Sequence, residues 1–326
     1  MRRLATAALT LALLTGAAQA LEGKLVLYTS QPNADAQQTV DAFMAANPGV
    51  TVEFVRDGTP KVMAKLRAEI EAGAPQADVL LIADVVTMEG LKAEGLLMAH
   101  EGADVSAYDA GLHDAAKTYF STKLITTGIV YNTAAPMKPT SWKDLTAEAA
   151  KGQVILPSPL ASGAALIHTV TLTSNLPEGW DFYKALAENG ALAQGANGGV
   201  LQAVAGGEKL YGMIVDFMPI REKAKGAPVE FVFPAEGVSA VTEPVAIMAS
   251  TKNPDAAKAF VDFLISEEGQ TLASAQGYIP AHPAVALPAG YPDRSAIKVL
   301  PFDAAKALAD EQKNRDTFGQ IFGATP

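Results

Sequence analysis

Ser158, Ser162 and Gly163 belong to the stretch of this sequence best suited to hold a small anion, SPLASGAAL. The apolar run QVILP before it predicts a strand, and the residues from Ala164 onward predict a helix. The first backbone N–H groups of a helix have no partner within the helix, so the turn before it can bind an oxyanion. A serine hydroxyl can add a hydrogen bond, and glycine lets an anion approach the backbone closely. The alternative is that Ser162 only caps the helix, as serine commonly does.

Polar side chains follow the predicted strands in both halves of the chain. In the first half they are Thr29, Ser30, Gln31, Thr59 and Asp84, and in the second half Ser158, Ser162, Asn197 and Asp216. Glu243 stands where the chain would return to the first half. Any one of these residues could be only a turn or cap residue. Their joint placement favours a ligand-binding cleft between two halves of the molecule.

The residue types that enzymes use for nucleophilic or metal chemistry are missing or scattered. The chain has no cysteine, which excludes a thiolate nucleophile, a disulfide and a cysteine-ligated metal. Its four histidines, at positions 100, 113, 168 and 282, lack the spacing of metal ligands. The sequence also lacks the motifs of serine hydrolases, zinc proteases and nucleotide-binding loops. We therefore expect a binding protein, not an enzyme, with no catalytic residue, no metal ligand and no cofactor.

The first twenty residues have the layout of a secretory signal peptide. A basic start, MRR, is followed by an apolar segment and by AQA at 18–20, which is a cleavage-site pattern. A membrane anchor is the alternative, but the apolar run is shorter than the roughly 20 residues that a span needs. We expect residues 1–20 to be removed and the mature protein to be periplasmic, without membrane insertion. No cysteine is present to carry a lipid anchor.

Composition and charge narrow the choice of partners. The formal net charge is −10 and no cluster of Lys and Arg stands out, which argues against nucleic acid or anionic lipid. This balance still allows an anionic ligand, because local helix ends can hold one. Apolar residues make up 49% of the chain, enough for two cores over this length. We expect a monomer of two domains that binds a small molecule.

Strands and helices alternate along the chain. The runs 24–28, 50–55 and 78–82 predict strands, and 34–47 and 61–72 predict the helices between them. Such alternation indicates an α/β fold with a parallel sheet, whose ligands bind at the carboxyl ends of the strands. A long strand candidate, LITTGIVYN, then opens a second α/β unit without a flexible linker. This favours two lobes that are joined by strands.

Seven stretches together point to one family. They are LVLYTSQ at 25–31, PQADVLL at 75–81, LASGA at 160–164, NGGVLQAVAGGE at 197–208, TEPVAI at 242–247, NPDAAKAFVDFLISEEGQ at 253–270 and GYIPAHP at 277–283. In them the chain resembles the periplasmic solute-binding proteins of ABC importers, in the group that includes the ferric-ion-, phosphonate- and hexose-phosphate-binding proteins.

The resemblance implies a fold and a partner. The fold is the two-lobed type II periplasmic binding fold, each lobe a mixed, mostly parallel sheet flanked by helices. Two hinge strands join the lobes, which close on ligand. We expect lobe 1 at 21–127 plus 240–285 and lobe 2 at 128–239 plus 286–326. The partner implied is the membrane permease of an ABC importer.

The resemblance also bears on the ligand. Ferric-ion-binding members use a histidine after the first strand, a glutamate after the third, and an adjacent tyrosine pair in the second lobe. Here the first position reads TSQP, the second ends in Asp84, and Phe217 and Met218 stand in place of the tyrosines. The group also holds an anion with a Ser-Gly-Ala helix start and an asparagine. These are kept, as Ser162, Gly163, Ala164 and Asn197.

The expected ligand is therefore a small anionic molecule that carries phosphorus, such as 2-aminoethylphosphonate or a sugar phosphate. Its oxyanion would bind at the helix start after Ser162, with Ser158 and Asn197 assisting. Asp84, Asp216 and Glu243 would face an amine or hydroxyls at the other end. Chelated ferric iron, a polyamine and a carboxylate remain as alternatives.

Overall fold

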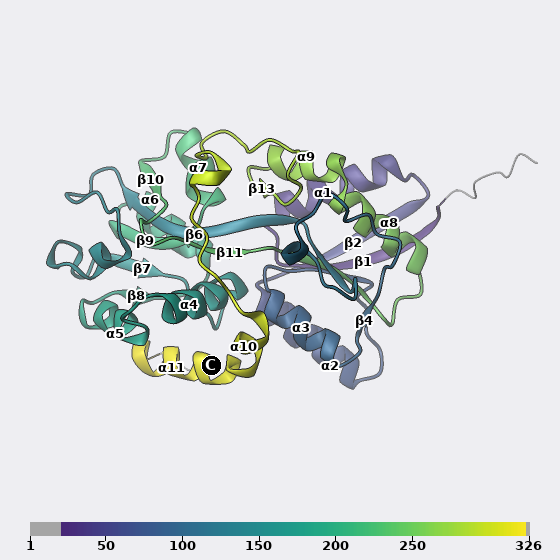
Figure 1. The fold of residues 1–326 in the computed structure, drawn as a ribbon, viewed down its shortest axis with the longest axis horizontal. Helices are drawn as coiled ribbons and strands as arrows, with labels where there is room; N and C mark the ends of the chain where they lie inside the picture. The colour runs from purple at the N-terminus through teal and green to yellow at the C-terminus, as the bar shows by residue number, and fades with distance from the viewer. Residues whose placement is uncertain (1–20, 324–326) are drawn as a thin grey trace, which may run out of the picture.

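The computed structural model describes residues 21–323, which form two α/β lobes side by side (Figure 1). The predicted signal peptide lies outside the described residues. None of the helices in the described part is both long enough and apolar enough to cross a membrane.

The first lobe is built on a six-stranded sheet. β1 (Gly23–Thr29), β2 (Val50–Arg56) and β3 (Val79–Leu81) run parallel, and β12 (Pro244–Met248) lies antiparallel to β3. β4 (Leu97–Met98) and β5 (Tyr119–Ser121) pair with β12. The helices of this lobe are α1 (Asn33–Ala46), α2 (Thr59–Glu71), α3 (Val85–Ala93), α8 (Pro254–Ile265) and α9 (Glu267–Ala275).

The second lobe is built on a seven-stranded sheet. Its strands are β6 (Lys123–Asn132), β7 (Val154–Leu156), β8 (Leu192–Ala193), β9 (Tyr211–Val215), β10 (Val229–Val232), β11 (Ser239–Val241) and β13 (Ile279–Pro280). Its helices are α4 (Gly163–Asn175), α5 (Trp180–Glu188), α6 (Asn197–Ala205) and α7 (Phe217–Ala224). Short 3₁₀ turns occur at Ala110–Leu112, Trp142–Thr146, Glu148–Ala150 and Arg294–Ala296.

Apolar side chains cover both faces of each sheet, because successive residues of a strand face opposite sides. In the first lobe, Leu25 and Leu27 pack in one core with Phe43 of α1, while Tyr28 packs in another core with Leu66 of α2. The second lobe has the same two-sided arrangement. Each such side chain contributes about 1.5–3 kcal/mol by its burial. The sheets therefore hold the loops at their edges in fixed positions.

Two adjacent strands carry the chain between the lobes. β6 and β11 run antiparallel, with Thr127 opposite Ser239, and β6 crosses the middle of the molecule (Figure 1). At the crossing the backbone N–H of Thr122 donates to the carbonyl oxygen of Thr242 at 3.2 Å. This arrangement confirms the predicted two-lobed fold. The sheets are more mixed than simple alternation predicts, because β6 and β12 run antiparallel to their neighbours.

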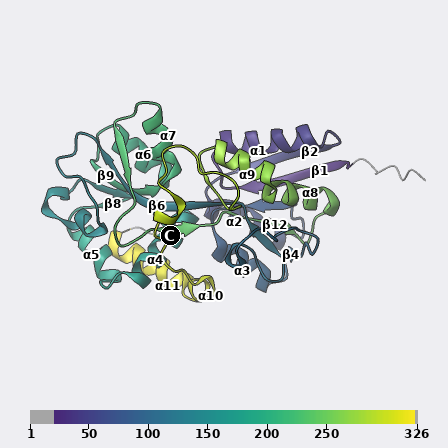
Figure 2. The same ribbon diagram turned by 45° about the horizontal axis from the view of Figure 1, so that its top comes forward.

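The C-terminal part of the chain passes between the lobes again. α10 (Ala304–Ala309) packs against α3 of the first lobe, and α11 (Glu311–Phe322) packs against α5 of the second. Both views show these helices running along one side of the molecule from the first lobe to the second (Figures 1 and 2). The chain breaks at Asp310, which separates the two helices.

Candidate functional site

A cavity of about 190 Å³ lies between the lobes, at the carboxyl ends of the parallel strands. The first lobe and the hinge contribute Ser30, Pro32, Arg56, Gly58, Thr59, Ala83, Glu243 and Tyr278. The second lobe and β6 contribute Ile125, Ala161, Ser162, Gly163, Ala164, Ala196, Asn197, Gly198, Val215, Phe217 and Met218. The wall thus combines loops that are far apart in the sequence.

The lobes touch each other beside this cavity. A Cβ atom added at Gly163 would lie 2.8 Å from Cβ of Asp84 and 2.9 Å from the carbonyl oxygen of Ala83. A Cβ atom added at Gly58 would lie 2.7 Å from the carbonyl oxygen of Ala161. These glycines allow an approach of the two backbones that other residues would prevent. The described conformation is therefore one in which the lobes are closed on each other.

The starts of α2, α4 and α6 line the cavity, and so does the start of α7, which the carboxylate of Asp216 caps. In the described structure α2 and α6 begin without a side-chain cap, at Gly58 and Ala196. Among the described residues, none accepts a hydrogen bond from the backbone N–H of Gly163 or Gly198. Free N–H groups and the positive ends of three helix dipoles therefore face one small space, which favours an anion there.

Ser162 and Asn197 connect two of these helix starts. The Oγ atom of Ser162 accepts a hydrogen bond from the backbone N–H of Ala165 at 3.3 Å and caps α4. Asn197 donates from Nδ2 to the same Oγ at 3.4 Å, and its Oδ1 accepts from the N–H of Val215 at 3.1 Å. Ser162 is thus a cap, as the simpler interpretation held, and it also lines the cavity.

Arg56 adds a positive charge to the cavity wall. Its side chain is anchored by Nε, which donates to the carbonyl oxygen of Gln31 at 2.7 Å, while the residue stays exposed. Nearby, the Oγ atom of Ser30 accepts from the N–H of Ala83 at 2.8 Å. The hydroxyl proton of Ser30 is then available to a ligand. Both groups suit an oxyanion.

Two of the predicted carboxylates are directed at helix starts and do not line the cavity. Asp84 caps α3, because Oδ1 accepts from the backbone N–H of Val86 at 3.0 Å and Oδ2 accepts from the Thr87 hydroxyl at 2.7 Å. Asp216 accepts from the N–H of Phe217 at 2.7 Å and from the N–H and hydroxyl of Thr126 at 3.0 and 2.6 Å. Burial raises the pKa of both carboxyls, that of Asp216 to about 6.

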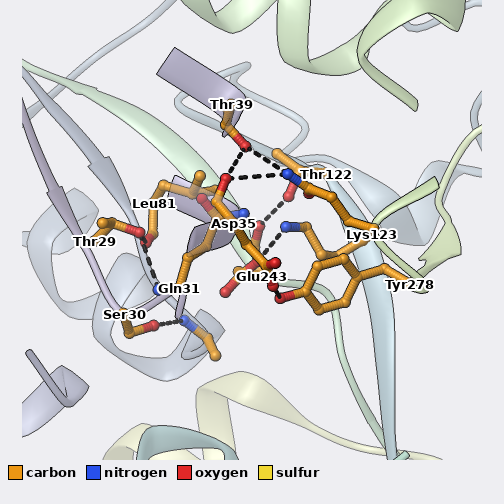
Figure 3. A network of polar contacts seen from close by, with 12 residues as sticks. Thr29, Ser30, Gln31, Asp35, Thr39, Leu81, Thr122, Lys123, Glu243 and Tyr278 are labelled. Carbon is orange, nitrogen blue, oxygen red and sulfur yellow. Dashed lines mark hydrogen bonds and ion pairs between the residues drawn. The ribbon is translucent and has the colours of Figure 1, made fainter. Parts of the chain in front are cut away.

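Glu243 is the predicted carboxylate that does line the cavity. It forms an ion pair with Lys123 at 2.6 Å, and both side chains are only 3% exposed (Figure 3). Burial raises the pKa of Glu243, while Lys123 opposes the shift. The backbone of Glu243 has a φ of 38°, a strained conformation for a residue other than glycine. Its carbonyl oxygen accepts from the Thr122 hydroxyl at 2.7 Å, which fixes this conformation at the hinge.

Eight of the thirteen predicted site residues line the cavity. They are Ser30, Thr59, Ser162, Gly163, Ala164, Asn197, Phe217 and Glu243. The other five, Thr29, Gln31, Asp84, Ser158 and Asp216, are buried beside it. Thr29 and Ser158 brace their own loops, by hydrogen bonds to Leu81 and Leu160. Contact of any of these residues with a ligand remains a prediction.

Sequence reasoning missed Arg56, Lys123 and Tyr278. Arg56 is the last residue of β2, so its position at the end of a strand was a signal that could have been used. Tyr278 lies in the GYIP stretch already noted, and its ring is 4.1 Å from Nζ of Lys123. Residues this far apart in the chain are brought together only by β13 pairing with β6.

Within residues 21–323 there is no group of three or more metal-ligating side chains. The helix starts, the hydroxyls and Arg56 at the cavity suit the binding of an anion by hydrogen bonds and helix dipoles.

Comparisons with known proteins agree with the two-lobed fold. A model of the bacterial extracellular solute-binding protein family matches residues 38–299. An uncharacterized protein of Haemophilus influenzae is 31% identical over 317 residues, covering 92% of this chain and 90% of that protein. A probable ABC transporter periplasmic-binding protein of Sinorhizobium fredii is 27% identical, covering 86% of this chain and 81% of its own.

Solved structures share the fold. The periplasmic binding protein AfuA from Actinobacillus pleuropneumoniae, with fructose-6-phosphate bound, has a TM-score of 0.84 at 24% identity, covering 93% of this chain and 99% of its own. Iron-bound HitA from Pseudomonas aeruginosa has a TM-score of 0.79 at 21% identity, covering 91% and 99%. At these identities the likeness establishes the fold alone.

Proposed function

The chain belongs to the bacterial extracellular solute-binding protein family, and from this premise we propose that it captures a small phosphate- or phosphonate-bearing solute. Membership makes it the solute-binding component of an ABC transporter, with a small-molecule ligand and a membrane permease as partners. The proposed class of ligand depends on the residues that line the cavity.

The observation that carries the proposal is the convergence of three helix starts and Arg56 on one cavity between the lobes. A phosphoryl group has three oxygens that can accept hydrogen bonds from N–H groups on several sides. Gly163 and Gly198 lie at the starts of α4 and α6, and their backbone N–H groups have no acceptor among the described residues. Hydroxyls of Ser30 and Thr59 complete a donor set that suits an oxyanion.

The other end of the ligand is less strongly specified. Because Asp84 and Asp216 serve as helix caps, Glu243 is the carboxylate available on the cavity wall within the described residues. It can accept a hydrogen bond from a hydroxyl as well as from an amine. We therefore propose sugar phosphates alongside 2-aminoethylphosphonate. That the related AfuA structure holds fructose-6-phosphate supports including them.

The three alternative ligands are a polyamine, a carboxylate and chelated ferric iron. A polyamine would need several unpaired carboxylates. Because Asp84 and Asp216 cap helices, the cavity supports a polyamine less than the sequence suggested. Ferric iron would have to arrive with a chelator, since the wall offers helix starts and hydroxyls and the tyrosine pair is replaced by Phe217 and Met218. We further propose a monomeric, periplasmic protein released by cleavage after Ala20. N-terminal sequencing and light scattering of the exported protein would test this.

The deciding experiment is calorimetry on protein comprising residues 21–326, stripped of ligand by unfolding and refolding. The panel is 2-aminoethylphosphonate, fructose 6-phosphate, inorganic phosphate, ferric citrate and spermidine. We expect micromolar or tighter binding of at least one organophosphorus compound and none of spermidine. Tight binding of ferric citrate or spermidine without any organophosphorus response would contradict the proposed ligand class.

A further inference from the structure

Arg221 reaches from the second lobe to the first. It lies on α7, and its Nη1 atom contacts both carboxylate oxygens of Asp35 on α1, at 2.9 and 3.3 Å. The Asp35 side chain is 8% exposed and that of Arg221 is 25% exposed. Opposite charges that are largely removed from water interact more strongly than charges on an open surface. The pair is therefore a candidate to hold the two lobes together.

The same guanidinium supports two walls of the cavity. Its central carbon lies 4.5 Å from the Phe217 ring centroid and 4.6 Å from that of Tyr278. The two rings are 4.5 Å apart, and both line the cavity. Nε and Nη2 of Arg221 are buried and have no hydrogen-bond partner in the described part of the chain. Cation–π contact with the rings takes the place of such bonds.

Tyr278 also contacts Asp35, the partner of Arg221. Its hydroxyl donates to Oδ2 of Asp35 (Figure 3). Arg221 contacts the same oxygen. Gly277, the preceding residue, lets the backbone pass close to Arg221, because a Cβ atom there would lie 3.0 Å from Nε. The guanidinium is thus held by α1, by the segment before β13 and by its own helix.

We propose that Arg221 is a positioning residue of the ligand site, an interlobe clamp that acts through Phe217, Tyr278 and Asp35 without contacting the ligand. This inference rests on the proposed binding function of the cavity. Removing Arg221 leaves Asp35 with a buried charge and one remaining side-chain hydrogen bond, which disfavours the closed conformation. It also frees the two rings that wall the cavity. Lysine would keep the charge but lacks the flat surface that lies against two rings.

The test compares affinity, stability and lobe separation in one set of proteins. The variants are Arg221→Gln, Arg221→Lys, Asp35→Asn and the double variant Arg221→Gln with Asp35→Asn. Affinities for fructose 6-phosphate and 2-aminoethylphosphonate are measured by calorimetry, and ligand-free unfolding is measured in urea. Since the chain has no cysteine, Lys61→Cys on α2 and Gln202→Cys on α6 can carry spin labels, and the distance between the labels reports closure. Lys223→Gln, on the outer side of the same helix, is the matched control.

We expect Arg221→Gln to weaken binding about tenfold or more, Arg221→Lys to weaken it less, and the double variant to be no worse than either single change. The label distance should shift toward wider separations in Arg221→Gln, and Lys223→Gln should match the wild type. The clamp would be overturned if the changes at positions 35 and 221 were non-additive in the unfolding free energy but additive in the binding free energy.

The experiment distinguishes a failure of the proposed ligand class from a failure of the proposed clamp. If the wild type binds neither probe, the proposed ligand class fails, while the label distances in ligand-free protein still test the clamp. Identical distance distributions for Arg221→Gln and the wild type, with and without probe, would overturn it.

Discussion

At the scale of single residues, Arg56 is the side chain whose charge the cavity presents to an anion. We expect Arg56→Gln to weaken binding of the organophosphorus ligand at least tenfold, because a charge-assisted hydrogen bond to a phosphoryl oxygen is lost. The residue is exposed, so the free energy of unfolding should change by no more than about 0.5 kcal/mol. Calorimetry and urea unfolding of the same preparation measure the two effects.

Lys61→Gln is the control for this prediction, since Lys61 carries the same charge nearby with a side chain that is 79% exposed. It should bind like the wild type. Equal affinity of Arg56→Gln and the wild type would show that the anion does not bind against Arg56.

Asp216 gives a prediction on pH. Burial raises its pKa from 3.8 to about 6, so the folded protein holds this proton more tightly than the unfolded chain does. The carboxyl therefore stabilises the fold below about pH 4, and this contribution is lost as the pH rises through about 6. Asp216→Asn removes the titration. The unfolding free energy of the wild type minus that of the variant should thus fall by up to about 3 kcal/mol between about pH 4 and pH 7.

Urea unfolding of both proteins at four pH values measures this difference. His168, whose pKa burial lowers to about 3, titrates in both proteins and cancels in the subtraction. A difference that stays constant or grows with pH would contradict the assigned burial effect.

At the scale of elements, the start of α4 serves the fold and the cavity with the same atoms. Ser162 caps the helix and lines the cavity, so Ser162→Ala should cost about 1 kcal/mol of stability as well as ligand affinity. The two losses can be separated. Ser162→Asp retains a good cap and places a negative charge beside the anion, so we expect it to preserve stability and abolish binding.

Thermal unfolding and calorimetry of the two variants check this expectation. If Ser162→Asp binds the ligand as tightly as the wild type, the start of α4 serves only as a helix cap, and the oxyanion must bind elsewhere.

At the scale of the whole molecule, closure depends on the absence of a side chain at Gly163. An added Cβ atom would lie 2.8 Å from Cβ of Asp84 and 3.1 Å from Oγ1 of Thr59, both in the opposite lobe. We therefore expect Gly163→Ala to hold the lobes apart and to reduce ligand affinity more than tenfold. Each lobe keeps its own core, so the unfolding free energy should change little. X-ray scattering with and without ligand reports the closure.

Gly198→Ala is the matched control, because it also lies at a helix start on the cavity wall, and a Cβ atom there meets nothing within 4 Å. It should close on ligand like the wild type. If both variants lose affinity equally, the effect comes from blocked N–H groups at the helix starts and not from the contact between lobes.

The amino-acid sequence by itself was enough to predict the two α/β lobes, the family resemblance and the helix start after Ser162. These depend on local signals, namely apolar periodicity, turn residues and short stretches such as LASGA, which persist whatever the rest of the chain does. Helices α7 and α9 were not predicted, and they contain Pro219 and Gly269, two residues that weaken a local helix signal.

Only the tertiary structure decided which polar side chains face the cavity. Position after a strand brings a residue to the right edge of a sheet, but a short carboxylate turns toward the nearest unpaired N–H groups. For Asp84 and Asp216 these are the starts of α3 and α7, so both became caps. Arg221, Asp35 and Tyr278 meet because the lobes pack against each other, and no local pattern in the sequence encodes a contact between residues more than fifty positions apart.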